Sequence, residues 1–181
     1  IDTRTKIDGQ VYTFIDTAGL KRKGYRQAQP DVFSGFQTFK SIRRSDVVFF
    51  LIDVTEPITK QDQVIAGEIF DLSKGVIIIA NKLDIFDGSE KELKAYIEHH
   101  FPFLWFSPVF TLSAKTGKGL QEAIDAIKPI YENRHKVIEQ EKLDLVLAQT
   151  IKTNPPKRLR DQREPKVHGL TQVETNPPTF R

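Results

Sequence analysis

Short apolar runs alternate with amphipathic segments along the first 131 residues of the chain. The runs at 47–52 and 76–80 consist of Val, Ile, Phe, Leu and Ala, and turn-forming or polar residues bound them. Runs of this length and composition are typical of strands buried on both faces of a parallel sheet. Residues 59–72, between them, repeat apolar side chains at helical spacing. Strands that alternate with helices predict an α/β fold with a doubly wound, mostly parallel sheet.

The remaining elements are predicted from the same periodicities. The pair Asp8-Gly9 can supply the positive φ angles of a tight two-residue turn, so the segments on either side of it are expected to form a hairpin. The hairpin strands are expected at 2–7 and 10–15, and two further short strands at 109–112 and 170–174. Further helices are expected at 32–45, 89–100, 120–131 and 136–151.

The pattern changes after about Glu132, which predicts a domain boundary there. The amphipathic helix at 136–151 has no strand directly before it, and Asn154-Pro155-Pro156 should end it. We therefore expect one α/β domain over residues 1–132 and a second, smaller α+β domain over 133–181.

Composition narrows the class of protein. A hydrophobic content of 39% and a charged content of 28% are ordinary for a globular protein, and no apolar run reaches the roughly 20 residues that span a bilayer. The absence of cysteine excludes disulfides and thiolate metal sites, and it fits a reducing compartment, so we expect a cytoplasmic protein with no membrane partner. Basic clusters at 21–26 and 157–163 could meet phosphate groups or could simply be solvated.

Two polar signatures follow apolar runs. Asp16-Thr17-Ala18-Gly19 comes after the run at 11–15, and Asn81-Lys82-Leu83-Asp84 comes after the run at 76–80. Ligands of open α/β sheets bind outside the carboxyl ends of the strands. Both signatures are therefore expected to face a ligand.

The second signature has a chemical reason to bind guanine. A carboxylate that faces two adjacent N–H donors makes a bidentate, charge-assisted pair, and guanine presents such donors at N1 and its exocyclic amine whereas adenine does not. We expect Asp84 to bind the base, Asn81 to tie neighbouring loops together, and Lys82 to lay its alkyl stem along the base plane. A plain surface turn is the alternative for this quartet taken alone.

Two further groups complete the predicted site. Ser113-Ala114-Lys115 follows the next predicted strand, where backbone N–H groups could meet the guanine carbonyl oxygen. Asp16 could hold Mg²⁺, directly or through water, and the N–H of Gly19 could meet a terminal phosphate. Each signature is common by itself. Their order, each after a separate apolar run, predicts a guanine nucleotide site.

These three motifs resemble the third, fourth and fifth motifs of translation-factor-type GTPases. The intervening stretches Ile42–Val48, Ile52–Glu56 and Ile58–Gln63 resemble the second GTPase domain of the EngA (also called Der) family of bacterial tandem-domain GTPases. Segments near Pro155-Pro156 and from Thr171 resemble the start of the KH-like domain of that family.

The resemblance implies a P-loop GTPase domain that binds GTP or GDP with Mg²⁺ and hydrolyses GTP as a switch. It implies a role in assembly of the large ribosomal subunit, with the subunit and its RNA as partners and a second GTPase domain in the same natural chain. The nucleotide-binding residues that it implies are Asp16, Thr17, Ala18, Gly19, Leu20, Asn81, Lys82, Asp84, Ser113, Ala114 and Lys115.

The sequence departs from the family pattern in its phosphate half. The Gly-rich phosphate loop and the threonine of the first switch are absent, so catalytic residues stay unassigned and the isolated 181 residues are expected to bind nucleotide poorly. We expect natural residues before Ile1, because the strands at Val11 and Val47 otherwise lack a neighbour between them. Leu20 stands where many small GTPases carry the glutamine that orients water, and the resemblance implies help from potassium.

Two function classes remain open. One is a regulatory GTPase, and the other is an RNA-binding assembly scaffold in which nucleotide only tunes the interface. Lys157, Arg158 and Arg160 are the candidates for contact with RNA phosphates. An ATP-using P-loop protein is disfavoured by Asp84. Trp105 is expected in the core or at a helix-to-strand corner.

Overall fold

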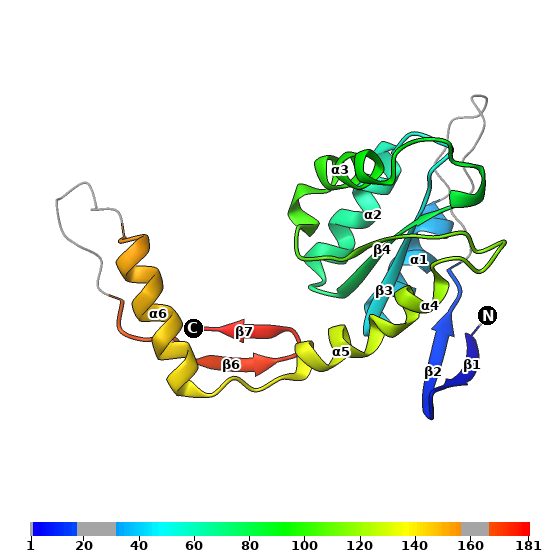
Figure 1. Cartoon of the computed structure of the whole chain (residues 1–181). Helices are drawn as coiled ribbons and strands as arrows, with labels where there is room; N and C mark the ends of the chain where they lie inside the picture. Colours follow the sequence, from blue (N-terminus) through cyan, green and yellow to red (C-terminus); the bar gives the residue numbers. More distant parts are fainter. Residues whose placement is uncertain (1, 18–31, 157–166) are drawn as a thin grey trace. The chain divides into compact units, whose positions relative to one another are not determined.

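The computed structural model describes residues 2–17, 32–156 and 167–181, and the chain forms two compact units that divide between Ile130 and Tyr131 (Figure 1). In chain order the elements of the first unit are β1 (Asp2–Ile7), β2 (Gln10–Ile15), α1 (Val32–Arg44), β3 (Val47–Asp53), α2 (Lys60–Asp71), β4 (Gly75–Asn81), the 3-10 helix η1 (Leu83–Ile85), α3 (Glu90–His100), η2 (Pro102–Leu104), β5 (Val109–Thr111), α4 (Leu120–Asp125) and the start of α5 (Ile127–His135). The unit alternates strands and helices as predicted.

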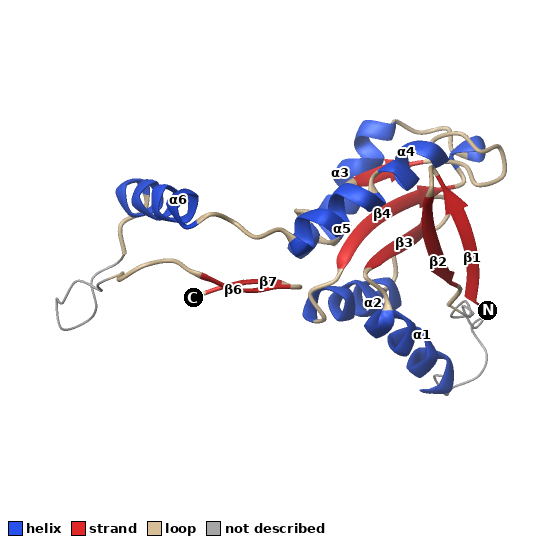
Figure 2. Cartoon of the chain, turned by 90° about the horizontal axis from the view of Figure 1, so that it is seen from below, coloured by secondary structure: helices blue, strands red, loops and turns tan. Residues whose placement is uncertain are grey.

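A three-stranded parallel sheet in the order β3-β4-β5 forms the centre of the first unit. Residues 75–80 of β4 are all buried, which explains why its sequence is apolar without alternation. Ile78 packs in one core cluster with residues of α1, α2 and α3, while Ile77 and Ile79 pack in a second cluster with Ala123 of α4. Figure 2 shows α1 and α2 on one side of the sheet and α4 and α5 on the other. The predicted α/β fold with helices on both faces of a parallel sheet is confirmed.

The N-terminal hairpin forms a sheet of its own. β1 and β2 pair antiparallel around Asp8 and Gly9, whose φ angles of 48° and 83° are those expected for the turn. The guanidinium of Arg44 binds the carboxylate of Asp2 at 3.0 and 2.7 Å, which ties the hairpin to the end of α1. In the described part of the chain no strand pairs with β3 on the side away from β4.

One predicted helix is broken for an identifiable reason. The helix predicted over 120–131 is broken into α4 and α5 at Ala126. Pro129 has no N–H to donate to the carbonyl of Asp125, and its ring would clash with that carbonyl in a continuous helix. α2 instead follows its prediction, because Thr59 caps it reciprocally with Asp62: the backbone N–H of each residue donates to the side chain of the other.

The second unit contains the end of α5, α6 (Gln140–Thr153) and the antiparallel strands β6 (Gln172–Thr175) and β7 (Pro178–Phe180). α6 begins four residues later than predicted. The side chain of Gln172 accepts a hydrogen bond from the N–H of Ile138 at 2.8 Å and donates to the carbonyl of Lys136 at 3.0 Å. These bonds hold the backbone before α6 out of the helix.

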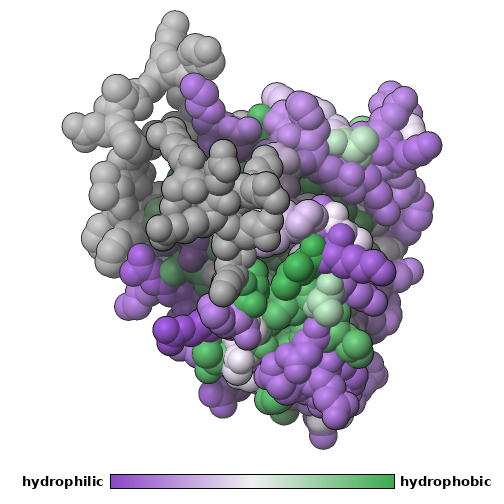
Figure 3. All heavy atoms as spheres, turned by 90° about the vertical axis from the view of Figure 1, so that its left-hand side faces the viewer, coloured by the Kyte–Doolittle hydropathy of each residue, from purple (hydrophilic) through white to green (hydrophobic). Residues whose placement is uncertain are grey.

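Apolar side chains reach the surface of the second unit. Leu143 of α6 is buried, whereas Leu145, Val146 and Val173 are exposed. Figure 3 shows hydrophobic side chains gathered among hydrophilic ones on the face that it draws. The assignment of this unit to a KH-like domain stays a prediction.

No helix in the described ranges is long and apolar enough to cross a membrane.

Candidate functional site

Three polar groups meet at the carboxyl ends of the parallel strands. Asp53 ends β3 and stands beside Asn81, which ends β4, while Ser113 follows β5 by two residues. Backbone bonds continue the pairing past β5, because the N–H of Leu112 donates to Ala80 at 2.9 Å and the N–H of Leu83 donates to Leu112 at 3.1 Å. The two predicted loops, 81–84 and 113–115, are therefore held side by side by the sheet itself.

Side chains tie these loops together more tightly. The amide oxygen of Asn81 accepts a hydrogen bond from the backbone N–H of Ala114 at 3.0 Å. The hydroxyl of Ser113, a residue only 1% exposed, donates to Oδ1 of Asp84 at 2.6 Å and accepts from the N–H of Thr116 at 3.2 Å. Ser113 thus fixes one oxygen of the Asp84 carboxylate and the start of the following turn.

The groups around Asp84 favour the ionised form of its carboxylate, which is a hydrogen-bond acceptor. The hydrogen bond from Ser113 is the main cause that lowers the pKa of Asp84, and it outweighs the opposing effect of partial burial. The positive charges of Lys115 and Lys82 lower this pKa further. Nζ of Lys115 lies 4.0 Å from Oδ2 of Asp84, and the Asp84 side chain is 18% exposed. The site therefore presents an ionised carboxylate held in place through one oxygen.

Lys82 is held in an unusual backbone conformation. Its φ of 74° lies in the left-handed region, which lets the chain turn sharply from β4 into η1. Its ammonium group pairs with Oδ2 of Asp53 at 2.7 Å. The other oxygen of Asp53 accepts hydrogen bonds from the backbone N–H and the hydroxyl of Thr55, at 3.0 and 2.6 Å.

Asp53 is the residue of this site that the sequence reasoning missed. Partial burial acts to raise its pKa, but the hydrogen bonds from Lys82 and Thr55 and the charge of Lys82 together lower the pKa to about 2. The signal in the sequence was a carboxylate at the end of the apolar run 47–52, the same placement that identified the other candidates.

Gly119 allows the loop after β5 to close against the strand. Its φ is 76°, and a Cβ built on it would lie 2.6 Å from the carbonyl oxygen of Thr111 and 3.0 Å from Cβ of Leu112. Only glycine combines this backbone conformation with so close an approach. The start of α4 is thereby fixed against the strand end that carries Ser113.

The phosphate half of the predicted site is less complete. Asp16 and Thr17 are exposed just after β2, while Ala18, Gly19 and Leu20 lie outside the described residues. The predicted RNA-contact residues Lys157, Arg158 and Arg160 also lie outside them. Within the described ranges no group of three or more His, Cys, Asp or Glu side chains could hold a metal ion. The exposed carboxylate of Asp16 fits one direct or water-mediated ligand of a hard cation.

Comparison with known sequences agrees with this geometry. The family described as 50S ribosome-binding GTPase matches residues 1–82. A protein named GTPase Der from Oceanobacillus iheyensis is 38% identical over 183 aligned residues, and one from a Geobacillus species is 34% identical. Both alignments cover 99% of this chain and 42% of the relative, so the chain spans less than half the length of the curated relatives it matches.

Comparison with solved structures supports the fold. Nucleolar GTP-binding protein 1 from Plasmodium falciparum matches with a TM-score of 0.54 and 20% identity, over 84% of this chain and 78% of that protein. Translation elongation factor SelB from Methanococcus maripaludis matches with a TM-score of 0.57 and 17% identity, over 77% of this chain and 29% of that protein. Along nearly its whole length the chain is similar to relatives named GTPase Der, and residues 1–82 match a GTPase family model, so it carries a P-loop GTPase domain like that of the EngA/Der family.

Proposed function

We propose that this chain belongs to an enzyme that binds GTP, hydrolyses it to GDP and uses the difference between the two states as a switch. The observation that carries the proposal is the Asp84 carboxylate, which Ser113 holds at 2.6 Å between the Asn81 loop and the Ala114 loop. Membership of a GTPase family supports the reaction.

The geometry supports guanine over adenine. An ionised carboxylate can accept two parallel N–H bonds from N1 and the exocyclic amine of guanine, whereas N1 of adenine is itself an acceptor and would face the negative charge. Ser113 holds Oδ1 of Asp84 through one of its lone pairs, and each carboxylate oxygen can accept more than one bond. The backbone N–H of Lys115 would meet the guanine carbonyl oxygen, and the alkyl stem of Lys82 would cover one face of the base.

The phosphate half of the proposed site uses Mg²⁺ bound to the nucleotide. Asp16 would contribute a ligand, directly or through water, and the motif residues Thr17, Ala18, Gly19 and Leu20 would lie beside the phosphates. Leucine cannot hydrogen-bond water, so Leu20 cannot orient the attacking water as a glutamine would. Hydrolysis must then rely on another arrangement, and from the resemblance to the EngA/Der family we propose that a potassium ion assists it.

The proposed partner is the large ribosomal subunit with its RNA, and the proposed compartment is the cytoplasm. The description of the matching family as a 50S ribosome-binding GTPase supports this choice. The natural chain would also carry a second GTPase domain, and residues 133–181 would begin a KH-like domain in which Lys157, Arg158 and Arg160 contact RNA phosphates.

Single-turnover GTP cleavage by the full-length natural protein tests the function. We expect faster cleavage in potassium than in sodium and a further increase when large-subunit particles are added. Equal rates in the two salts would refute the role of potassium. An absence of stimulation by particles, together with unchanged biological function of Asp84→Asn, would favour an RNA-binding scaffold instead.

A further inference from the structure

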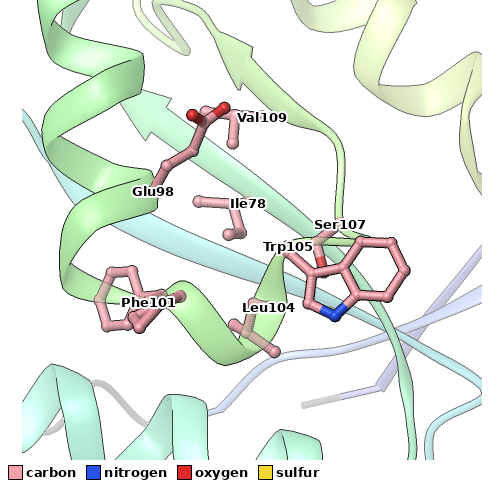
Figure 4. Close-up of a pocket in the computed structure, with 8 residues that line it drawn as sticks. Ile78, Glu98, Phe101, Leu104, Trp105, Ser107 and Val109 are labelled. Atoms are coloured by element: carbon pink, nitrogen blue, oxygen red, sulfur yellow. The ribbon is translucent and has the colours of Figure 1, made fainter. Parts of the chain in front are cut away.

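A small cavity lies beneath Trp105, away from the guanine site. It has a volume of about 220 Å³ and is lined by residues of β4, α3, η2, the loop that follows η2, and β5 (Figure 4). The cavity adjoins Val109, where β5 begins, whereas the candidate nucleotide loop follows the opposite end of that strand at Ser113. The two sites are therefore distinct.

Of the two places predicted for Trp105, the helix-to-strand corner is the one observed, because the residue ends η2 shortly before β5 and does not lie in the core. Its side chain is 84% exposed, whereas Phe101 and Leu104 in the same segment are 1% and 2% exposed. The ring of Phe106 meets the indole edge to face, with centroids 6.0 Å apart. So large an exposed aromatic surface is costly in water and is typical of residues that contribute most to binding a partner.

The cavity combines an apolar floor with polar groups at its margin. The floor is formed by Ile78 with Phe101 and Leu104, all of which are buried. Glu98, whose carboxylate is exposed, and Ser107 also line the cavity. In Figure 4 the side chains of Glu98 and Trp105 lie to either side of Ile78.

The two polar groups are without partners. No residue in the described ranges forms an ion pair with Glu98, including Lys94 one turn earlier on α3. The hydroxyl of Ser107 is buried and has no hydrogen-bond partner among the described residues, but it is closed to solvent and so is not available to a ligand. The exposed carboxylate of Glu98 is therefore the group that a ligand can reach.

We propose that this cavity binds a basic side chain, arginine in preference to lysine, presented by a protein partner. The volume is below the roughly 300–1,000 Å³ of pockets for drug-sized ligands, so it suits one side chain. The aliphatic stem of arginine would cover the apolar floor, and its planar guanidinium would stack on the indole of Trp105. The guanidinium would also donate to the carboxylate of Glu98.

A protein partner fits better than RNA. An exposed tryptophan could also stack on a nucleobase, but the unpaired carboxylate of Glu98 would repel the phosphates next to that base. The same carboxylate attracts a guanidinium. The negative charge at the margin of the cavity therefore favours an arginine of a protein partner over RNA.

Tryptophan fluorescence tests the proposal, because Trp105 is the single tryptophan of these 181 residues. In the full-length natural protein, subtracting the spectrum of Trp105→Phe isolates its signal. We expect N-acetyl-arginine amide to change this signal saturably, with N-acetyl-norleucine amide binding at least roughly tenfold more weakly because it lacks the charge. Glu98→Gln should weaken arginine binding by a similar factor, whereas Glu92→Gln, an exposed glutamate of the same helix outside the cavity, should leave it unchanged.

Several results would overturn the proposal. They are no response to the arginine amide, an equal response to norleucine, or an arginine response that Glu98→Gln leaves unchanged. A saturable response to single-stranded oligouridylate that survives Glu98→Gln would instead make the surface an RNA contact. Because Glu98 and Trp105 are both exposed, these substitutions leave the core intact.

Discussion

Alanine substitutions at Gly119 and Gly117 allow the effect of backbone strain to be distinguished from the effect of a steric clash near the guanine site. Both have left-handed φ angles, 76° and 80°. A Cβ on Gly119 would lie 2.6 Å from the carbonyl oxygen of Thr111, whereas a Cβ on Gly117 would meet no atom within 4 Å. Alanine at either position should lower the free energy of unfolding by about 1–2 kcal/mol through the φ angle alone. Only Gly119→Ala adds a clash with backbone, which costs about 1–3 kcal/mol more because a strand cannot yield as a flexible side chain can.

The clash should reach the nucleotide site, because relieving it moves the strand end that carries Ser113. We expect Gly119→Ala to lower GDP affinity of the full-length natural protein by roughly tenfold or more, and Gly117→Ala to lower it only a few-fold. Fluorescent-nucleotide titration measures both, and Gly67→Ala in α2, which also meets nothing within 4 Å, controls for the added methyl group. Equal losses of GDP affinity in Gly117→Ala and Gly119→Ala, or full GDP affinity in Gly119→Ala, would show that the contact with Thr111 does not affect the nucleotide site.

Two further predictions concern carboxylates whose pKa is lowered. Ser113→Ala removes the hydrogen bond that chiefly lowers the pKa of Asp84, so this pKa should rise. A protonated carboxyl cannot accept both N–H bonds of the base. As the solution is acidified from about pH 7 to pH 4, the variant should therefore lose GDP affinity at a higher pH than the wild type does. Coincident pH profiles would count against this role of Ser113. Asp53, whose folded pKa is about 2 against an ordinary 3.8, stabilises the fold above its ordinary pKa, and this contribution is lost as the pH falls from about 4 towards 2. Asp53→Asn should therefore lower the free energy of unfolding by about 1 kcal/mol at neutral pH, after allowance for its partial exposure, and by progressively less in acid. Urea unfolding followed by fluorescence at several pH values measures the difference, and a pH-independent loss would contradict the assignment.

The elements that burial dictates could be predicted from the sequence. The apolar run at 76–80 becomes a strand covered on both faces, and the Asp8-Gly9 pair becomes the hairpin turn. These features depend on local composition and on a periodicity that the sequence displays directly.

The features that were missed depend on contacts between distant residues or on a single side chain. The start of α6 is set by Gln172, which is more than thirty residues away in the sequence. The break between α4 and α5 could have been predicted, because Pro129 is a local signal. The sequence left both the core and a helix-to-strand corner open for Trp105, because an apolar neighbourhood does not say which of its aromatic rings faces water.

The residues of the candidate site that belong to sequence motifs could be predicted, whereas a residue that supports them could not. Asn81, Asp84, Ser113 and Ala114 meet because parallel strands bring their carboxyl ends to one edge, which chain order and strand type predict. Asp53 was missed although it also ends an apolar run, because its role of holding Lys82 appears only in the structure. A side chain whose function is to hold another side chain carries no motif of its own.

Asp84 is proposed to bind the guanine base and to select it over other bases. The affinities of the Asp84→Asn variant for GDP and for xanthosine diphosphate measure this role. The asparagine amide keeps only one acceptor oxygen. Its NH2 group can donate to the second carbonyl oxygen of xanthine but would face the exocyclic amine of guanine donor to donor. We predict that the full-length protein with Asp84→Asn loses GDP affinity by roughly a hundredfold and binds xanthosine diphosphate more tightly than the wild type does. Wild-type affinity for GDP in this variant would contradict the account.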